Sequence, residues 1–141
     1  MSDLGLTHVA LPVADLDASL AFYRKYASLE RVHERVDPAT GGRVAWVSDR
    51  TRPFVVVLIQ VADVKHPLLP LAHLGVGLAS REAVDRLVGE ARAEGFSCYG
   101  PIDAGEPVGY FALISDPDQH TLELAHGQEV GLAVARAAER P

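Results

Sequence analysis

The hydrophobic positions of this chain follow a helical period in two stretches and a strand-like pattern around them. Apolar residues recur at helical spacing behind Asp15 and again behind Ser80. Asp and Ser favour the position before a helix because their side-chain oxygens accept hydrogen bonds from its free amides. Short apolar or alternating runs surround both helices. The strands predicted from these runs are 7–13, 29–36, 43–48, 54–62, 72–79, 96–99, 109–115 and 121–126.

The two halves of the chain overlay as one repeated unit of strand, helix and three strands. His8 and His73 each lie seven residues before the predicted helix cap, and 65 positions separate them. Gln60 and Glu123 occupy similar positions in the last strand of each half, at an offset of 63. A repeat of this length is one supersecondary unit used twice. We therefore predict an α+β fold in which the first and fourth strands of each half lie close together.

Composition and charge exclude several classes of protein. The chain is 48% hydrophobic and 23% charged, which is ordinary for a globular domain. A net charge of −6 without any Lys/Arg run argues against nucleic acid and anionic membranes as partners, although a local pocket can still bind an anionic small molecule. Cys98 is the only cysteine, so an intrachain disulfide is impossible. The start at 1–3 lacks signal-peptide character and the apolar run 54–59 is too short to span a membrane, so a cytoplasmic location is expected.

Two histidines and one glutamate form the candidate site. His8 and His73 lie inside apolar strands, where a single histidine is more often a core residue, but two in repeat register favour a shared site. Glu123 stands between two leucines, and a buried carboxylate there needs a cation or hydrogen bonds; an outward-facing strand position is the alternative. Two imidazoles and one carboxylate suit one divalent ion, Fe, Zn, Ni, Mn or Co, with open coordination positions.

Further candidates are weaker. Gln60 is a further candidate ligand through its amide oxygen, or a residue that orients a water. Trp46, Phe54 and Tyr110 lie on predicted strands and are candidates for a substrate pocket, with core packing as the alternative. The chain has neither a nucleophile elbow nor a phosphate-binding glycine loop.

Three segments resemble the vicinal oxygen chelate superfamily, which includes glyoxalase I, bleomycin resistance proteins and extradiol dioxygenases. They are LTHVALPVADLDASLAFYRKYASLE, AHLGVGLASREAVDRLVGEARAEG and YFALISDPDQHTLEL, and the resemblance covers about residues 4–127. It implies paired βαβββ modules that form a cup-shaped mixed sheet around a metal, and commonly a homodimer. The metal positions of the family would fall on His8, Gln60, His73 and Glu123.

The resemblance also implies how the chain is organised. We expect a single glyoxalase-like domain over residues 1–141, whose tail contains an alanine-rich stretch, 131–140. This stretch is interpreted as a short amphipathic helix that packs on a partner subunit, or as a frayed end. The parts of the domain are module one, 4–62, a connector, 63–71, module two, 72–127, and the C-terminal tail, 128–141.

The reaction is less defined than the family. Glyoxalase I usually has a carboxylate where Gln60 stands, and methylmalonyl-CoA epimerase has a glutamate base in the third strand, where 43–48 offers no acid. Extradiol dioxygenases add a histidine and a tyrosine around the metal. The leading hypothesis is a metal-dependent enzyme that chelates adjacent oxygens of a small substrate, with Glu123 as its base, an isomerase or lyase rather than a dioxygenase. The alternatives are a non-catalytic dimeric drug-binding protein like the bleomycin resistance proteins, and a module with a vestigial site.

Overall fold

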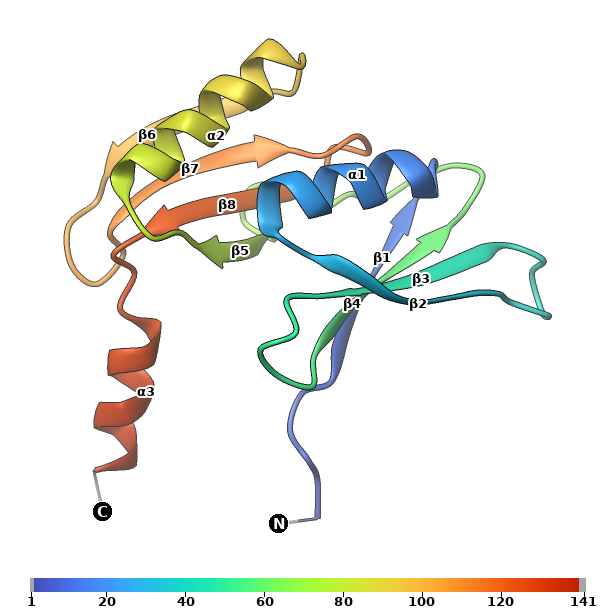
Figure 1. The fold of residues 1–141 in the computed structure, drawn as a ribbon, viewed down its shortest axis with the longest axis horizontal. Helices are drawn as coiled ribbons and strands as arrows, with labels where there is room; N and C mark the ends of the chain where they lie inside the picture. The colour runs from blue at the N-terminus through green and yellow to red at the C-terminus, as the bar shows by residue number, and fades with distance from the viewer. Residues whose placement is uncertain (1, 140–141) are drawn as a thin grey trace. The chain divides into compact units, whose positions relative to one another are not determined.

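The computed structural model describes residues 2–139 and divides the chain into two compact units, Met1–Pro67 and Leu68–Pro141. Each unit contains one strand, one helix and three strands in that order (Figure 1). The first holds β1 (His8–Val13), α1 (Leu16–Ala27), β2 (Glu30–Val36), β3 (Arg43–Ser48) and β4 (Val55–Gln60). The second holds β5 (Leu74–Gly77), α2 (Arg81–Ala93), β6 (Cys98–Asp103), β7 (Tyr110–Ser115) and β8 (Thr121–His126), followed by α3 (Val130–Ala138).

Both units have the same sheet topology. The strand orders are β1-β4-β3-β2 and β5-β8-β7-β6, so the first strand of each unit lies at the edge and pairs with the last. That pairing is parallel, and the remaining pairs are antiparallel. The predicted α+β fold of two repeated βαβββ modules is confirmed, with one mixed four-stranded sheet in each module.

Side-chain caps begin the two main helices where the sequence predicts them. Asp15 accepts a hydrogen bond from the Ala18 amide through its Oδ1 at 3.1 Å. Ser80 accepts one from the Ala83 amide through its Oγ, also at 3.1 Å. Each cap satisfies an amide that has no partner within the helix, which contributes about 1 kcal/mol.

Each helix covers one face of its own sheet. In the first unit the core lies between α1 and the side chains of β1, β3 and β4 that point toward it, Leu11, Val13, Ala45, Val47, Val56 and Leu58. In the second unit α2 packs Val84, Leu87, Val88 and Ala91 against Ala112, Ile114, Leu122 and Leu124. Because successive strand side chains alternate between faces, the remaining positions form an open face on the side away from each helix.

A buried turn ties the connector to the last strand. Asp116 is 1% exposed, and its Oδ1 accepts hydrogen bonds from the amides of Asp118 and His120, both at 2.8 Å. The His120 ring is equally buried, and its Nδ1 accepts from the Leu68 amide at 2.9 Å. The Thr121 amide in turn donates to the Leu68 carbonyl. These bonds fix the start of β8.

The C-terminal tail forms a helix, α3, whose side chains are all exposed. Its first residues follow a hydrogen bond from the Glu129 amide to the Pro107 carbonyl at 2.9 Å. The last position of the predicted tail helix, Arg140, lies outside the described residues. Within residues 2–139 the helices are all too short or too polar to cross a bilayer.

Two glycines of the loop between β6 and β7 provide a matched test of backbone packing. Gly105 and Gly109 both have positive φ, +69° and +86°. A Cβ at Gly105 would meet open space, whereas one at Gly109 would overlap the His126 carbonyl and lie 2.8 Å from the Gly127 carbonyl carbon. We expect Gly105→Ala to cost about 1 kcal/mol for the left-handed backbone. Gly109→Ala should cost about 1–3 kcal/mol more, because the added methyl is overpacked.

Urea denaturation of the two variants measures this difference. Equal losses of unfolding free energy in both variants would show that the backbone around Gly109 moves aside, and would contradict the tight approach to β8.

Candidate functional site

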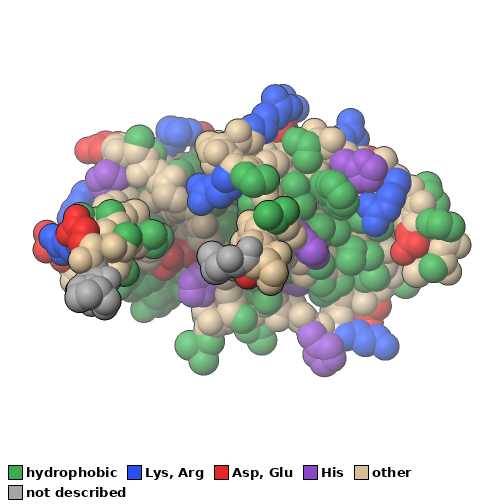
Figure 2. Space-filling view, turned by 90° about the horizontal axis from the view of Figure 1, so that it is seen from below, with side chains coloured by type: hydrophobic (Ala, Val, Ile, Leu, Met, Phe, Trp, Pro, Cys, Tyr) green, Lys and Arg blue, Asp and Glu red, His purple; other side chains and the backbone are tan. Residues whose placement is uncertain are grey.

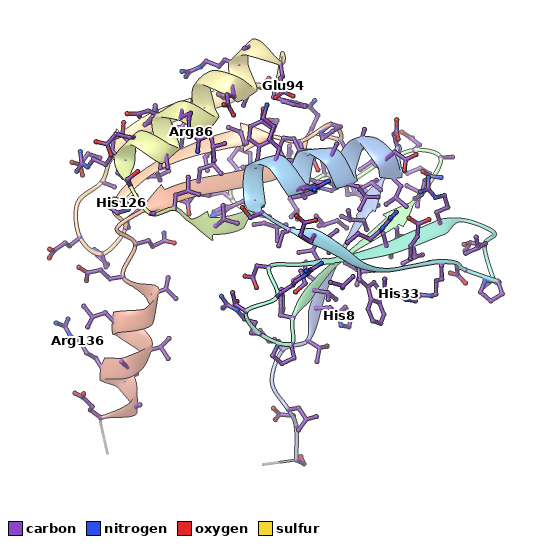
Figure 3. All side chains as sticks on the ribbon, viewed as in Figure 1. His8, His33, Arg86, Glu94, His126 and Arg136 are labelled. Carbon is purple, nitrogen blue, oxygen red and sulfur yellow. The ribbon has the colours of Figure 1, made fainter. Side chains whose placement is uncertain are left out.

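His8 begins β1 and projects from the face of the first sheet that lies away from α1 (Figure 3). It is exposed, and its Nδ1 lies 2.9 Å from the Thr7 hydroxyl oxygen. In the tautomer that has its proton on Nδ1, the ring donates to Thr7 and Nε2 keeps a lone pair for a metal. His8 is level with Val55 in the parallel pairing with β4.

Gln60 lies at the far end of the same pair of strands and on the opposite face. It is level with Val13, five residues from the level of His8, which is about 16 Å along a strand. Its Oε1 accepts a hydrogen bond from the Leu16 amide at 2.9 Å. The side chain therefore satisfies the first turn of α1, and the structure does not bring it to His8.

The strand pairing shows which residue of the first unit corresponds to Glu123. Glu123 is level with Gly75, and Val57 is level with Ala10, the residue 65 positions before Gly75. The last strands are therefore offset by 66 residues, so Gln60 corresponds to His126. The sequence overlay that pairs Gln60 with Glu123 shifts β4 by three residues from this register. Because side chains alternate between the two faces of a strand, a shift by an odd number of residues assigns Gln60 to the wrong face. The residue of the first unit that corresponds to Glu123 is therefore Val57, which is apolar.

His73 is oriented by a backbone hydrogen bond. Its Nδ1 lies 2.8 Å from the Pro70 carbonyl oxygen. A carbonyl only accepts, so Nδ1 carries the proton and Nε2 has the free lone pair. Histidines that bind metals are commonly held in this way, because the second hydrogen bond fixes the tautomer and the ring direction.

Glu123 lies on the open face of the second sheet. It is only 9% exposed, and its Oε2 accepts a long hydrogen bond of 3.4 Å from Nε2 in the side chain of Gln128. His73 immediately precedes β5, whose Gly75 is level with Glu123, so two residues of chain, about 7 Å when extended, separate His73 from that level. A Cβ at Gly75 would lie 3.4 Å from Oε2, so a glycine there leaves room for the carboxylate.

These groups suit a cation in the second unit. A carboxylate that is removed from water and has one weak donor gains free energy when it binds a cation. Within the described residues neither unit by itself gathers three His, Cys, Asp or Glu side chains as a metal-binding group.

The open face of the first sheet carries a pocket of about 630 Å3 beside His8. Trp46, Phe54 and Val57 are among its lining residues, so two of the three aromatic residues expected at a pocket lie there. Trp46 is 37% exposed and packs on the His33 ring, with 4.6 Å between ring centroids. In the view from below, apolar side chains gather over the first sheet with basic and histidine side chains among them (Figure 2).

Tyr110 occupies a different place from the one expected. Its hydroxyl donates to Asp85 on α2, and this hydrogen bond raises the pKa of the tyrosine. Arg81 lies over the Tyr110 ring at 4.7 Å and pairs with Asp103, whose pKa it lowers. Tyr110 therefore belongs to a polar cluster on the helix side of the second sheet, whereas Glu123 lies on the open face.

Sequence reasoning missed three arginines at the pocket, Arg35, Arg50 and Arg52. Arg35 comes from β2, and the other two come from the loop between β3 and β4. The pair of arginines in a short loop was a usable signal in an acidic chain. Only the strand pairing, however, places Arg35 on the same face.

Comparisons with known proteins agree with this fold. The Pseudomonas aeruginosa protein named Uncharacterized protein PA2024 is 34% identical over 129 residues, which cover 89% of this chain and 91% of that protein. A mutant of the fosfomycin resistance protein FosX from Listeria monocytogenes, complexed with Mn(II) and 1S,2S-dihydroxypropylphosphonic acid, has a TM-score of 0.72 at 20% identity, covering 94% of this chain and 98% of FosX. TnmS3, an antibiotic-binding protein from Streptomyces sp. CB03234, has a TM-score of 0.63 at 20% identity, covering 89% and 98%.

A family model also matches most of the chain. It describes the Glyoxalase/Bleomycin resistance protein/Dioxygenase superfamily, and the match spans residues 5–124, which include every strand of both units except the last two residues of β8. The repeated βαβββ topology agrees with this match. The chain therefore belongs to the Glyoxalase/Bleomycin resistance protein/Dioxygenase superfamily.

Proposed function

We propose that the protein is a divalent-metal-dependent enzyme for a small oxygenated substrate, with His8, His73 and Glu123 as the metal ligands. The observation that carries this proposal is the arrangement in the second unit, where His73, just before β5, is oriented by Pro70, and Glu123 on the neighbouring strand is buried. The complex of FosX with Mn(II) supports metal binding in a protein of this fold.

Gln60 leaves the proposed ligand set, because its amide oxygen accepts from the Leu16 amide on the helix side of the sheet. Three protein ligands leave open coordination positions, the arrangement typical of sites that bind substrate directly. A divalent ion held there supplies a Lewis acid for two adjacent oxygens of the substrate. Val57, the residue of the first unit that corresponds to Glu123, is apolar, so the first unit provides no second carboxylate ligand at this position.

Glu123 is the proposed general base. Its carboxylate is largely shielded from water, and one oxygen is held by Gln128. In this environment it can take a proton from a carbon beside a substrate carbonyl and return it. With one carboxylate for both roles, we favour an isomerase or lyase over a dioxygenase.

Metal content tests the ligand set. Protein purified without a histidine tag should contain about one divalent ion per chain, as expected for one set of three ligands. His8→Ala, His73→Ala and Glu123→Gln should each lose it. Gln60→Ala is the matched control, because it should keep the metal while the unfolding free energy falls by about 1 kcal/mol. Elemental analysis and urea denaturation measure the two quantities; metal-free wild type, or metal lost only in Gln60→Ala, would contradict the proposal.

Proton exchange tests the proposed base. In D2O, metal-loaded wild type should exchange the C–H beside the carbonyl of α-hydroxy ketones, followed by NMR. Glu123→Gln should slow the exchange roughly 100-fold or more, the usual contribution of a general base. A rate unchanged in Glu123→Gln would remove this residue from the mechanism.

A second candidate function is non-catalytic binding of a small molecule. The antibiotic-binding protein TnmS3 has this fold, and the pocket lies wholly within the first unit. A binding protein of this kind would keep its ligand affinity in His73→Ala and show no metal-dependent turnover.

The homodimer and the cytoplasmic location stay predictions. Light scattering after size exclusion tests the homodimer.

A further inference from the structure

The pocket of the first unit has an apolar interior. Ala10, Val55, Val57 and Ile59 line it from β1 and β4, all on the open face of the sheet. Trp46 adds an aromatic surface from β3. A volume of about 630 Å3 lies within the range of small-molecule sites. The interior therefore suits the apolar or aromatic body of a small molecule.

The polar part of the pocket is positive, in a chain whose net charge is −6. Arg35 and Arg50 have no carboxylate within ion-pair distance among residues 2–139, whereas Arg52 lies 3.7 Å from Asp49. The Arg35 guanidinium lies 5.7 Å from the centroid of the Trp46 ring, a cation–π contact that holds it over the pocket wall. Two guanidinium groups in the pocket wall without an acidic partner favour an anionic ligand in this pocket.

Hydrogen bonds hold the loop that carries Arg50. Asp49 accepts from the Thr51 hydroxyl at 2.6 Å and from the Thr51 amide at 2.8 Å, and the bond to the hydroxyl is the main reason that the pKa of Asp49 is lowered. The Arg50 amide donates to the Ser48 hydroxyl at 3.0 Å. A loop that is ordered before binding lowers the entropic cost of holding a ligand.

We infer that this pocket binds a small organic acid, whose negative charge Arg35 and Arg50 both attract and whose apolar body lies on Trp46 and Phe54. The inference deepens the proposed function by naming the class of its substrate, and it rests on that function for calling the bound molecule a substrate. His8 lines the same pocket, so the acid would lie beside one of the proposed metal ligands. Carboxylates and phosphonates share the required chemistry.

Tryptophan fluorescence provides a direct test, because Trp46 is the only tryptophan of the chain. Metal-free protein, prepared with EDTA, is titrated with phenylphosphonate, with benzoate and with uncharged benzamide. At least one of the two anions should give a saturable change with a Kd at least tenfold below that of benzamide, a difference of about 1.4 kcal/mol. The comparison of phenylphosphonate with benzoate shows which kind of acid fits better.

Variants assign the preference to the two arginines. Arg35→Gln and Arg50→Gln should each weaken the binding of the preferred anion about tenfold and leave benzamide unchanged. Arg50→Lys retains the charge and should keep an intermediate affinity. The matched control is Arg24→Gln on α1, which removes the same charge from a residue that pairs with Glu30 at 3.4 Å and does not line the pocket.

Two results would overturn the inference. One is equal affinity for benzamide and both anions, and the other is an equal loss of anion affinity in Arg24→Gln and Arg50→Gln. The titration uses metal-free protein, so its outcome is independent of the metal analysis. Anion preference in a protein that never binds metal would reject the proposed enzyme alone, and a metal-binding protein without anion preference would reject this inference alone.

Discussion

The parallel pairing between the first and the last strand of each unit determines which side chains can act together. In the first unit it makes Ala10 level with Val57, and in the second it makes Gly75 level with Glu123. One helix covers one face of each sheet, so a residue's place in this register decides whether it packs in the core or faces outward. The candidate ligands and the pocket are all consequences of that register.

The sequence was sufficient for the elements and for the repeat. The helix caps at Asp15 and Ser80 are recognisable from residue type alone, and seven strands of the eight were expected within two residues of both ends. The register of β4 could not be obtained in this way. Its residues, VVVLIQ, form a continuous apolar run with no alternation, so nothing in the sequence indicates which face Gln60 occupies.

Some of the residues that line the pocket could be predicted from the sequence. Trp46 and Phe54 could be selected as aromatic residues on or beside strands, and both line the pocket. Tyr110 satisfied the same criterion but lies on the helix side, where its hydroxyl reaches Asp85. The difference depends on tertiary pairing between α2 and β7, which a local pattern does not contain. Asp116 and His120 belong to the segment YFALISDPDQHTLEL, which carries part of the family resemblance, but their role in anchoring the connector needed the structure.

One face of each sheet is covered by a helix and the other is open, so substitutions on the two faces change different properties of the protein. Substitutions toward the helix, as at Leu58, act on the free energy of unfolding, because the side chain is fully buried. Substitutions one residue away, at Val57 or Ile59, change the wall of the pocket and leave the packing under α1 in place. Ligand preference in this chain can therefore diverge during evolution through β4 without passing through unstable intermediates.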